Sequence, residues 1–172
     1  RYATGGYICA SPFPYDGIFR RAVLNFKFHN CGAYAELLSH EMVRSIKDVY
    51  RDRKFDLVTC VPMHKDTLRK RGYNQAELLA KECARLLGIE YADLLAKTKK
   101  NKTQHSIKAA ERAKNVIGVY SPIDKNLIKG KRILIIDDII TTGSTLGECA
   151  RILNKCKCGE ICCCTLCTSL LI

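Results

Sequence analysis

No apolar run in the sequence approaches the roughly 18 residues needed to cross a bilayer, which excludes a membrane-spanning helix. The first residues, RYATGGYICASPFPYDG, lack the charged start and apolar stretch of a secretory signal, so we expect a cytoplasmic protein. The chain begins with Arg1 and not with methionine, and we expect the natural protein to continue upstream. Internal repeats and low-complexity linkers are also lacking. We therefore expect a single domain over residues 1–172, with an N-terminal helical part at about 15–50 and a core at about 55–172.

Acidic residues are scarce. The chain has 17 Asp and Glu against 29 Lys and Arg, which gives a formal net charge of +12. Such a charge favours an anionic partner, either a phosphate-rich small molecule or a nucleic acid, although a solubilising surface explains it equally well. Tyr and Phe are scattered, and the sequence shows no aromatic platform of the kind on which single-strand binders stack bases.

Cysteine is abundant, with eleven residues, and in a cytoplasmic chain we expect reduced thiols. Zinc sites usually pair ligands as C-x₂₋₄-C across a spacer. Here Cys162, Cys163 and Cys164 are consecutive, so in a strand their side chains must point to opposite faces. The run EICCCTLCTSLLI therefore favours a buried strand of small apolar side chains, with a metal site as the alternative.

Hydrophobic periodicity predicts alternating helices and strands. The helices are expected at Asp16–Phe28, Tyr34–Val49, Gln75–Leu87 and Thr145–Asn154, and the strands at Phe55–Val61, Val116–Tyr120, Arg132–Ile136 and Glu160–Leu166. Between them, Lys97–Asn115 is polar and basic, which indicates a long loop or a weak helix. This order predicts an α/β fold with a mostly parallel central sheet flanked by helices, and a ligand beyond the carboxyl ends of its strands.

The segment Ile133–Leu146, ILIIDDIITTGSTL, contains the strongest motif. Its buried strand delivers Asp137 and Asp138, which are costly there unless they meet a cation or hydrogen-bond donors. Gly143 allows a close approach of the backbone or an unusual φ angle, and the N–H groups of the following helix favour an anion. Hydroxyl donors come from Thr141, Thr142, Ser144 and Thr145. The motif predicts a phosphate cup beside two acids, as a ribose 5-phosphate requires; the alternative is an ordinary helix capped by Ser144 or Thr145.

The motif resembles the signature with which type I phosphoribosyltransferases bind 5-phosphoribosyl pyrophosphate (PRPP), and it lacks the Gly-Lys-Ser/Thr of a Walker loop. The stretch CVPMHKDTLRKRGYNQAELLAKECARLLG, above all Arg71–Gln75, resembles the ComF family of competence-related proteins within that superfamily. KTKKNKTQHSIKAAERAKNV and YDGIFRRAVLNFKFHN are similar to it as well. ComF proteins commonly begin with a four-cysteine zinc module, but only Cys9 stands in that region here, so this chain cannot form the module alone.

The resemblance implies a type I phosphoribosyltransferase-like domain that binds PRPP with Mg²⁺, the ion being held mainly through the ligand. Asp137 and Asp138 would be the catalytic acids on the ribose, and the loop Thr141–Thr145 would hold the 5-phosphate. The pyrophosphate would meet the loop after the first core strand and the basic residues that follow, which are Pro62, Met63, His64, Lys65, Arg69 and Arg71. Lys97–Asn115, with Gln104 and Arg112, would form a flexible lid or else a solvated connector. His64 receives no catalytic role, and Asn74 has the alternative of a simple helix cap.

Three functions follow from this resemblance. The first is a PRPP-binding protein that serves DNA uptake or DNA repair. The second is an active transferase that moves phosphoribose to a nucleobase or another acceptor. The third is an accessory protein that binds single-stranded DNA without turnover. Expected partners are PRPP, single-stranded DNA, DNA-processing proteins of competence and a second copy of the chain.

Overall fold

A mostly parallel sheet runs through the centre of the protein. The computed structural model describes residues 2–4, 6–28, 33–99 and 116–170. The sheet has the strand order β1-β2-β9-β8-β4-β5, with β3 also paired to β9. Its strands are β1 (Tyr2–Thr4), β2 (Tyr7–Ala10), β3 (Phe13–Pro14), β4 (Leu57–Cys60), β5 (Glu90–Tyr91), β8 (Arg132–Ile140) and β9 (Glu160–Thr168). The pair β1–β2 is antiparallel, and the other pairs of this sheet are parallel.

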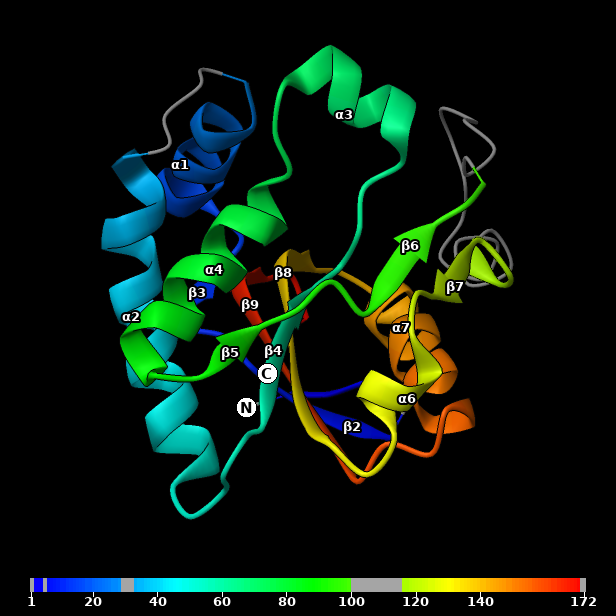
Figure 1. Ribbon diagram of the computed structural model, residues 1–172. Coiled ribbons are helices and arrows are strands. Elements are labelled where there is room, and N and C mark those ends of the chain that lie inside the picture. Colours follow the sequence, from blue (N-terminus) through cyan, green and yellow to red (C-terminus); the bar gives the residue numbers. More distant parts are fainter. Residues whose placement is uncertain (1, 5, 29–32, 100–115, 171–172) are drawn as a thin grey trace.

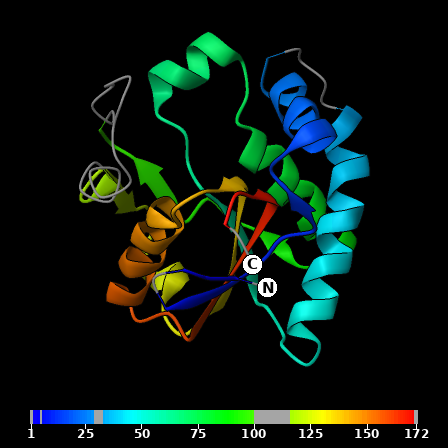
Figure 2. The ribbon, with the colours of Figure 1, turned by 180° about the vertical axis from the view of Figure 1, so that it is seen from behind.

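Helices cover both faces of the sheet, which confirms the predicted fold class (Figures 1 and 2). They are α1 (Gly17–Phe28), α2 (Ala33–Tyr50), α3 (Lys65–Arg71), α4 (Gln75–Leu87), α6 (Lys125–Ile128) and α7 (Ser144–Lys155). Helices α1, α2 and α4 lie on one face, while α6 and α7 lie on the other together with a small antiparallel pair, β6 (Leu95–Lys97) and β7 (Tyr120–Pro122). Among the helices of the described residues, none combines the length and the apolar character that a membrane crossing requires.

Strand β8 shows why the sheet is buried on both sides. Its residues Ile133–Ile136 are fully buried, and alternate side chains belong to different core clusters. Leu134 and Ile136 pack with α2 and α4, whereas Ile133 and Ile135 pack with α7. This alternation is the period of two that a strand imposes on its side chains.

Strand β9 contains the consecutive cysteines, and it is the buried strand that the sequence predicts. Cys162 and Cys164 belong to the core cluster on the α2 side, and Cys163 belongs to the cluster on the α7 side. All three are free thiols, and burial raises the pKa of Cys162 to about 11. These cysteines serve as small apolar side chains of the core.

The structure differs from the expected elements in several places, and the short elements β5, β6 and α6 are among those that the sequence did not predict. The predicted strand Val116–Tyr120 is wrong, because Gly118 has a φ of 71° and the Val119 N–H bonds back to the Val116 carbonyl, so the chain turns before β7 begins at Tyr120. Strand β8 continues past Ile136 to Ile140, because its last residues still pair with β9. Helix α3 and the three short strands before residue 15 had no counterpart in the sequence reading.

Candidate functional site

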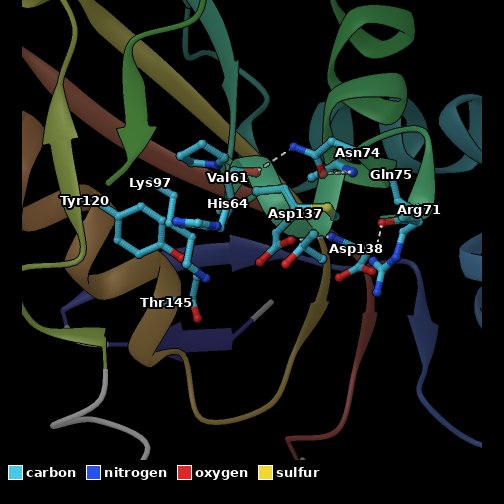
Figure 3. A pocket seen from close by; sticks show the side chains of 14 residues that line it. Val61, His64, Arg71, Asn74, Gln75, Lys97, Tyr120, Asp137, Asp138 and Thr145 are labelled. Carbon is cyan, nitrogen blue, oxygen red and sulfur yellow. Dashed lines mark hydrogen bonds between the residues drawn. The ribbon is translucent and has the colours of Figure 1, made fainter. Parts of the chain in front are cut away.

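A pocket of about 240 Å³ opens at the carboxyl ends of β4 and β8, where a parallel sheet is expected to bind its ligand (Figure 3). Several segments contribute to its wall, among them α3 through Thr67 and Arg71. Val61 follows β4, Asn74 and Gln75 start α4, Asp137 and Asp138 stand on β8, Thr145 lies in the first turn of α7, and Lys97 and Tyr120 come from the small second sheet. Residues that are far apart in the sequence therefore meet around one opening.

The paired acids lie on one side of this pocket. Asp137 and Asp138 are consecutive in β8, and both are half-buried. The Oδ1 atom of Asp137 accepts the backbone N–H of Asp138 at 2.8 Å. Figure 3 shows both carboxylates at the pocket, with Asp138 on the side of Arg71. The strand thus presents two carboxylates to one pocket.

The loop between β8 and α7 is the segment for which the sequence predicts a phosphate cup. The N-cap residue of α7 is Gly143, which has a φ of 74° and no side chain to form a cap. The alternative of a helix capped by the side chain of Ser144 or Thr145 is therefore wrong. The hydroxyls turn to each other instead: Thr142 Oγ1 and Ser144 Oγ lie 2.8 Å apart. A small hollow of about 30 Å³ lies within the loop. The N–H groups at the start of α7, a helix of 12 residues, suit an anion there.

Asn74 ties the opposite wall together. Its Oδ1 accepts the Ala76 N–H at 3.2 Å, which confirms the predicted cap of α4, and its Nδ2 donates to the Val61 carbonyl at 3.1 Å. The end of β4 and the start of α4 are thereby fixed to each other. Beside them, Arg71 donates to Gln75 Oε1 at 2.9 Å, so its guanidinium is oriented along the pocket.

The expected pyrophosphate residues divide into two groups. Pro62, Met63, His64 and Arg71 line the pocket. Lys65 and Arg69 lie on exposed positions of α3, outside the lining. His64 caps α3, because its Nδ1 accepts the Asp66 N–H at 3.2 Å, a structural role that agrees with its having no catalytic assignment. Gln104 and Arg112, with residues 100–115 of the expected lid, lie outside the described residues.

Lys97 and Tyr120 are site residues that sequence reasoning missed. They are register partners in the β6–β7 pair, and Lys97 Nζ lies 5.4 Å from the centroid of the Tyr120 ring. Burial lowers the pKa of Lys97, and the negative charge of Asp137 opposes part of that shift. The expectation placed Lys97 at the start of a loop, whereas it ends strand β6. Its position at the head of a basic segment was the one available signal, and Tyr120 had none.

Glu148 connects α7 to the turn that precedes β7. Its carboxylate accepts the Gly118 N–H at 2.9 Å and two bonds from Arg151, at 2.6 and 2.7 Å. The Glu148 side chain is 4% exposed, so its carboxylate is largely shielded from water, whereas the Arg151 side chain is 43% exposed. The wall that contains Tyr120 is therefore anchored to the same helix whose first turn lines the pocket.

The comparisons with known proteins agree with this geometry. The model of the phosphoribosyl transferase domain matches residues 73–170, which is more than half of the chain. Competence protein F of Haemophilus influenzae is 31% identical over 81% of this chain and 63% of its own length. Competence protein ComFC of Bacillus subtilis is 31% identical over 88% of this chain and 60% of its own length. The DNA utilization protein YhgH of Escherichia coli is 30% identical over 58% of this chain and 44% of its own.

The chain thus spans less than two thirds of the length of these relatives. Among solved structures, the glutamine PRPP amidotransferase of Bacillus subtilis, complexed with ADP and GMP, shares the fold with a TM-score of 0.52. It is 20% identical, and the match covers 77% of this chain and 26% of that one. With its parallel sheet, its acid pair and its hydroxyl-rich loop, the chain belongs to the phosphoribosyl transferase domain family, as a member of the ComF group.

Proposed function

We propose that the chain binds PRPP, or ribose 5-phosphate, together with Mg²⁺, and that it serves DNA uptake or DNA repair in this capacity. One observation carries the proposal. The acids Asp137 and Asp138 and the first turn of α7 face one pocket with Arg71 and Lys97 on its rim. Helix N-termini and cations attract phosphates, and carboxylates accept bonds from sugar hydroxyls. The names of the relatives support the link to DNA.

The ligand divides among the walls as follows. The 5-phosphate lies in the loop Thr141–Thr145, and the ribose hydroxyls donate to Asp137 and Asp138. The pyrophosphate lies toward residues 62–64 and Arg71, near the start of α4, where its charge meets the guanidinium and the N–H end of the helix. Lys65 and Arg69 add to the positive field from the exposed side of α3.

The donor set also fits Mg²⁺. This ion prefers oxygen ligands and keeps several waters, so that two carboxylates and the oxygens of a phosphate ligand suit it. The oxygens of the ligand and water would hold most of the ion, with Asp137 and Asp138 beside it, and the ion would neutralise the charge of the pyrophosphate. In the described part of the chain, no group of three or more His, Cys, Asp and Glu side chains could hold a metal ion.

A thermal shift measurement tests the binding. PRPP with Mg²⁺ at about 100 times Kd should stabilise the fold by roughly 2.7 kcal/mol, which raises Tm by roughly 5–10 °C in a domain of this size. The double variant Asp137→Asn with Asp138→Asn should lose this rise, because the amides cannot replace the two charges. The matched control, Asp48→Asn with Asp52→Asn at exposed positions of α2 and the turn after it, should keep it. A native chain without any Tm rise would refute the proposal.

Transferase activity is a second candidate. The acids lie beside the loop proposed for the 5-phosphate, so their negative charge would be near the anomeric carbon and would stabilise a cationic transition state there. In that reaction a nucleophile on the acceptor forms a bond to the anomeric carbon, and pyrophosphate leaves with the electrons of the broken C–O bond. Transferase activity is checked by measuring the release of pyrophosphate from PRPP in the presence of each of a panel of nucleobases. Release that depends on one base would show an enzyme, and binding without release would leave a PRPP-binding protein.

A further inference from the structure

A second pocket, of about 360 Å³, lies at the opposite end of the sheet. Phe55, just before β4, and Arg132, the first residue of β8, line it together with the ends of α2 and α4. The site of the acids begins five residues further along β8, at Asp137. At about 3.3 Å a residue, the two pockets are roughly 16 Å apart along the strand, so one ligand group cannot fill both.

The floor of this pocket is apolar and firmly held. Phe55, Leu87 and Ile89 are half-buried there. The Phe55 ring meets the Tyr50 ring edge-on, with centroids 5.7 Å apart and planes at 88°. The hydroxyl of Tyr50 lies 2.8 Å from the Ile8 carbonyl and 2.7 Å from the Cys163 carbonyl, so the aromatic pair is anchored to β2 and β9. The pocket therefore offers an apolar floor with an aromatic ring in a fixed place.

The rim is positively charged. Every charged residue that lines the pocket is a cation: Lys47, Arg51, Arg53, Lys54 and Arg132. Arg53 is paired with Glu160, and Arg132 is paired with Asp56 at 2.6 Å. Within the described ranges, the other three form no ion pair, and they are exposed. Three exposed cations around an apolar floor that contains an aromatic ring, in a protein with a net charge of +12, suit a partner that carries both anionic groups and an aromatic group.

We infer that this pocket is a second binding site, which takes a short stretch of single-stranded nucleic acid. Its phosphates would meet Lys47, Arg51 and Lys54, and one unstacked base would lie on the Phe55 floor. Single strands are bound by this combination of a basic rim and an aromatic surface, whereas a duplex keeps its bases stacked. An acidic peptide would satisfy the rim but has no base for the floor. The inference rests on the proposed link to DNA and gives it a location.

The test uses the full chain and a fluorescein-labelled oligo(dT) of about 20 nucleotides, with anisotropy read across a salt series. Arg51→Glu with Lys54→Glu should weaken binding at least about tenfold. Because each phosphate contact on a single strand contributes about 0.7 to the slope of log K against log salt, the slope should become shallower by roughly 1.4. The matched control, Lys125→Glu with Lys155→Glu, makes the same change of net charge from α6 and α7, and should weaken binding by less than about threefold.

The floor is tested by Phe55→Leu, which keeps an apolar side chain but removes the ring. It should weaken oligo(dT) binding about tenfold and leave the binding of polyglutamate unchanged. Equal losses in both charge-reversed variants, no effect of Phe55→Leu, or equal affinity for oligo(dT), a duplex and polyglutamate would each overturn the inference.

The PRPP-dependent rise in Tm, measured on the same variants, separates the two proposals. It should survive in all three, because the acids and the phosphate loop are untouched. If Arg51→Glu with Lys54→Glu binds oligo(dT) as well as the native chain does, this site is wrong while the DNA link stands. If the native chain binds no oligo(dT) at low salt but keeps its PRPP response, the nucleic-acid inference fails alone.

Discussion

At the scale of the residue, the half-buried Lys97 should make PRPP binding depend on pH. Burial lowers its pKa, so the ammonium loses its proton at a lower pH than a free lysine does. Only the charged form attracts phosphate, and PRPP affinity should therefore fall as pH rises through that lowered pKa. Lys97→Arg, which stays charged, should flatten the affinity over the pH range in which the native chain loses it, since a guanidinium keeps its proton throughout that range. Titration calorimetry across this range checks it.

The control is Lys99→Arg, at an exposed position two residues beyond Lys97, which should keep the native pH dependence. The same slope in the native chain and in Lys97→Arg would contradict a role for Lys97. Folding stability should change with pH in the opposite direction to that expected for a lysine in an ion pair. Holding Lys97 charged costs stability below the lowered pKa, and this cost disappears as the pH rises from the lowered pKa to the ordinary lysine value.

The residues of the site differ in how far the sequence could reveal them. Asp137, Asp138 and the loop Thr141–Thr145 were predictable, because their positions follow from one contiguous motif. Lys97 and Tyr120 were not predictable, because the pairing of β6 with β7 brings them together. Neither segment has a sequence pattern that indicates this pairing. The burial that lowers the pKa of Lys97 is likewise a property of the folded chain alone.

At the scale of the element, two glycines with left-handed backbone allow a matched test. Gly143 starts α7 with a φ of 74°, and Gly88 ends α4 with a φ of 67°. Gly143→Ala and Gly88→Ala should each destabilise the fold by roughly 1–2 kcal/mol, because a Cβ disfavours this conformation. Only Gly143→Ala should also reduce the PRPP-dependent rise in Tm, since it distorts the phosphate loop. An equal PRPP response in both variants would contradict the proposed place of the 5-phosphate.

Elements were predicted best where both ends carry a local signal. Helix α4 has the predicted bounds Gln75–Leu87, because Asn74 caps its start and Gly88 its end. Strand β8 was predicted too short, because two acids interrupt its apolar run, although the backbone keeps pairing beyond them. The three strands before residue 15 have two to four residues each, and such short runs acquire their conformation from the neighbouring strand β9 or from each other.

At the scale of the whole molecule, Glu148 should control stability in a pH-dependent way. The Arg151 guanidinium, and to a smaller extent the Gly118 N–H, hold the pKa of this carboxyl below its ordinary value. Its stabilisation is therefore present above the pKa of the unfolded chain and is lost as pH falls through the folded one. Glu148→Gln should cost roughly 1–3 kcal/mol at pH 7. Thermal melts from pH 7 to pH 3 should show that the difference in stability between the native chain and Glu148→Gln becomes smaller as the pH falls.

Glu82→Gln is the matched control. Glu82 forms a similar pair with an arginine three positions on, but its side chain is 18% exposed and the bonds recorded for it come from Arg85. Glu82→Gln should therefore lose less stability at pH 7 than Glu148→Gln does. A finding that Glu148→Gln loses no more stability than Glu82→Gln does, or that its loss is the same at pH 3 as at pH 7, would contradict this role. Either result would show that the bonds of Glu148 between α7 and the turn before β7 contribute little to stability.

The buried cysteines of β9 provide a way to measure how often the fold opens. Thiolates react with alkylating agents and disulfides, and burial keeps Cys162, Cys163 and Cys164 protonated and out of reach. Their strand lies between β2 and β8, so no edge can fray to expose them without breaking the sheet. The rate at which these three thiols are modified therefore reports the rate of global opening, and an oxidant reaches them chiefly while the chain is unfolded.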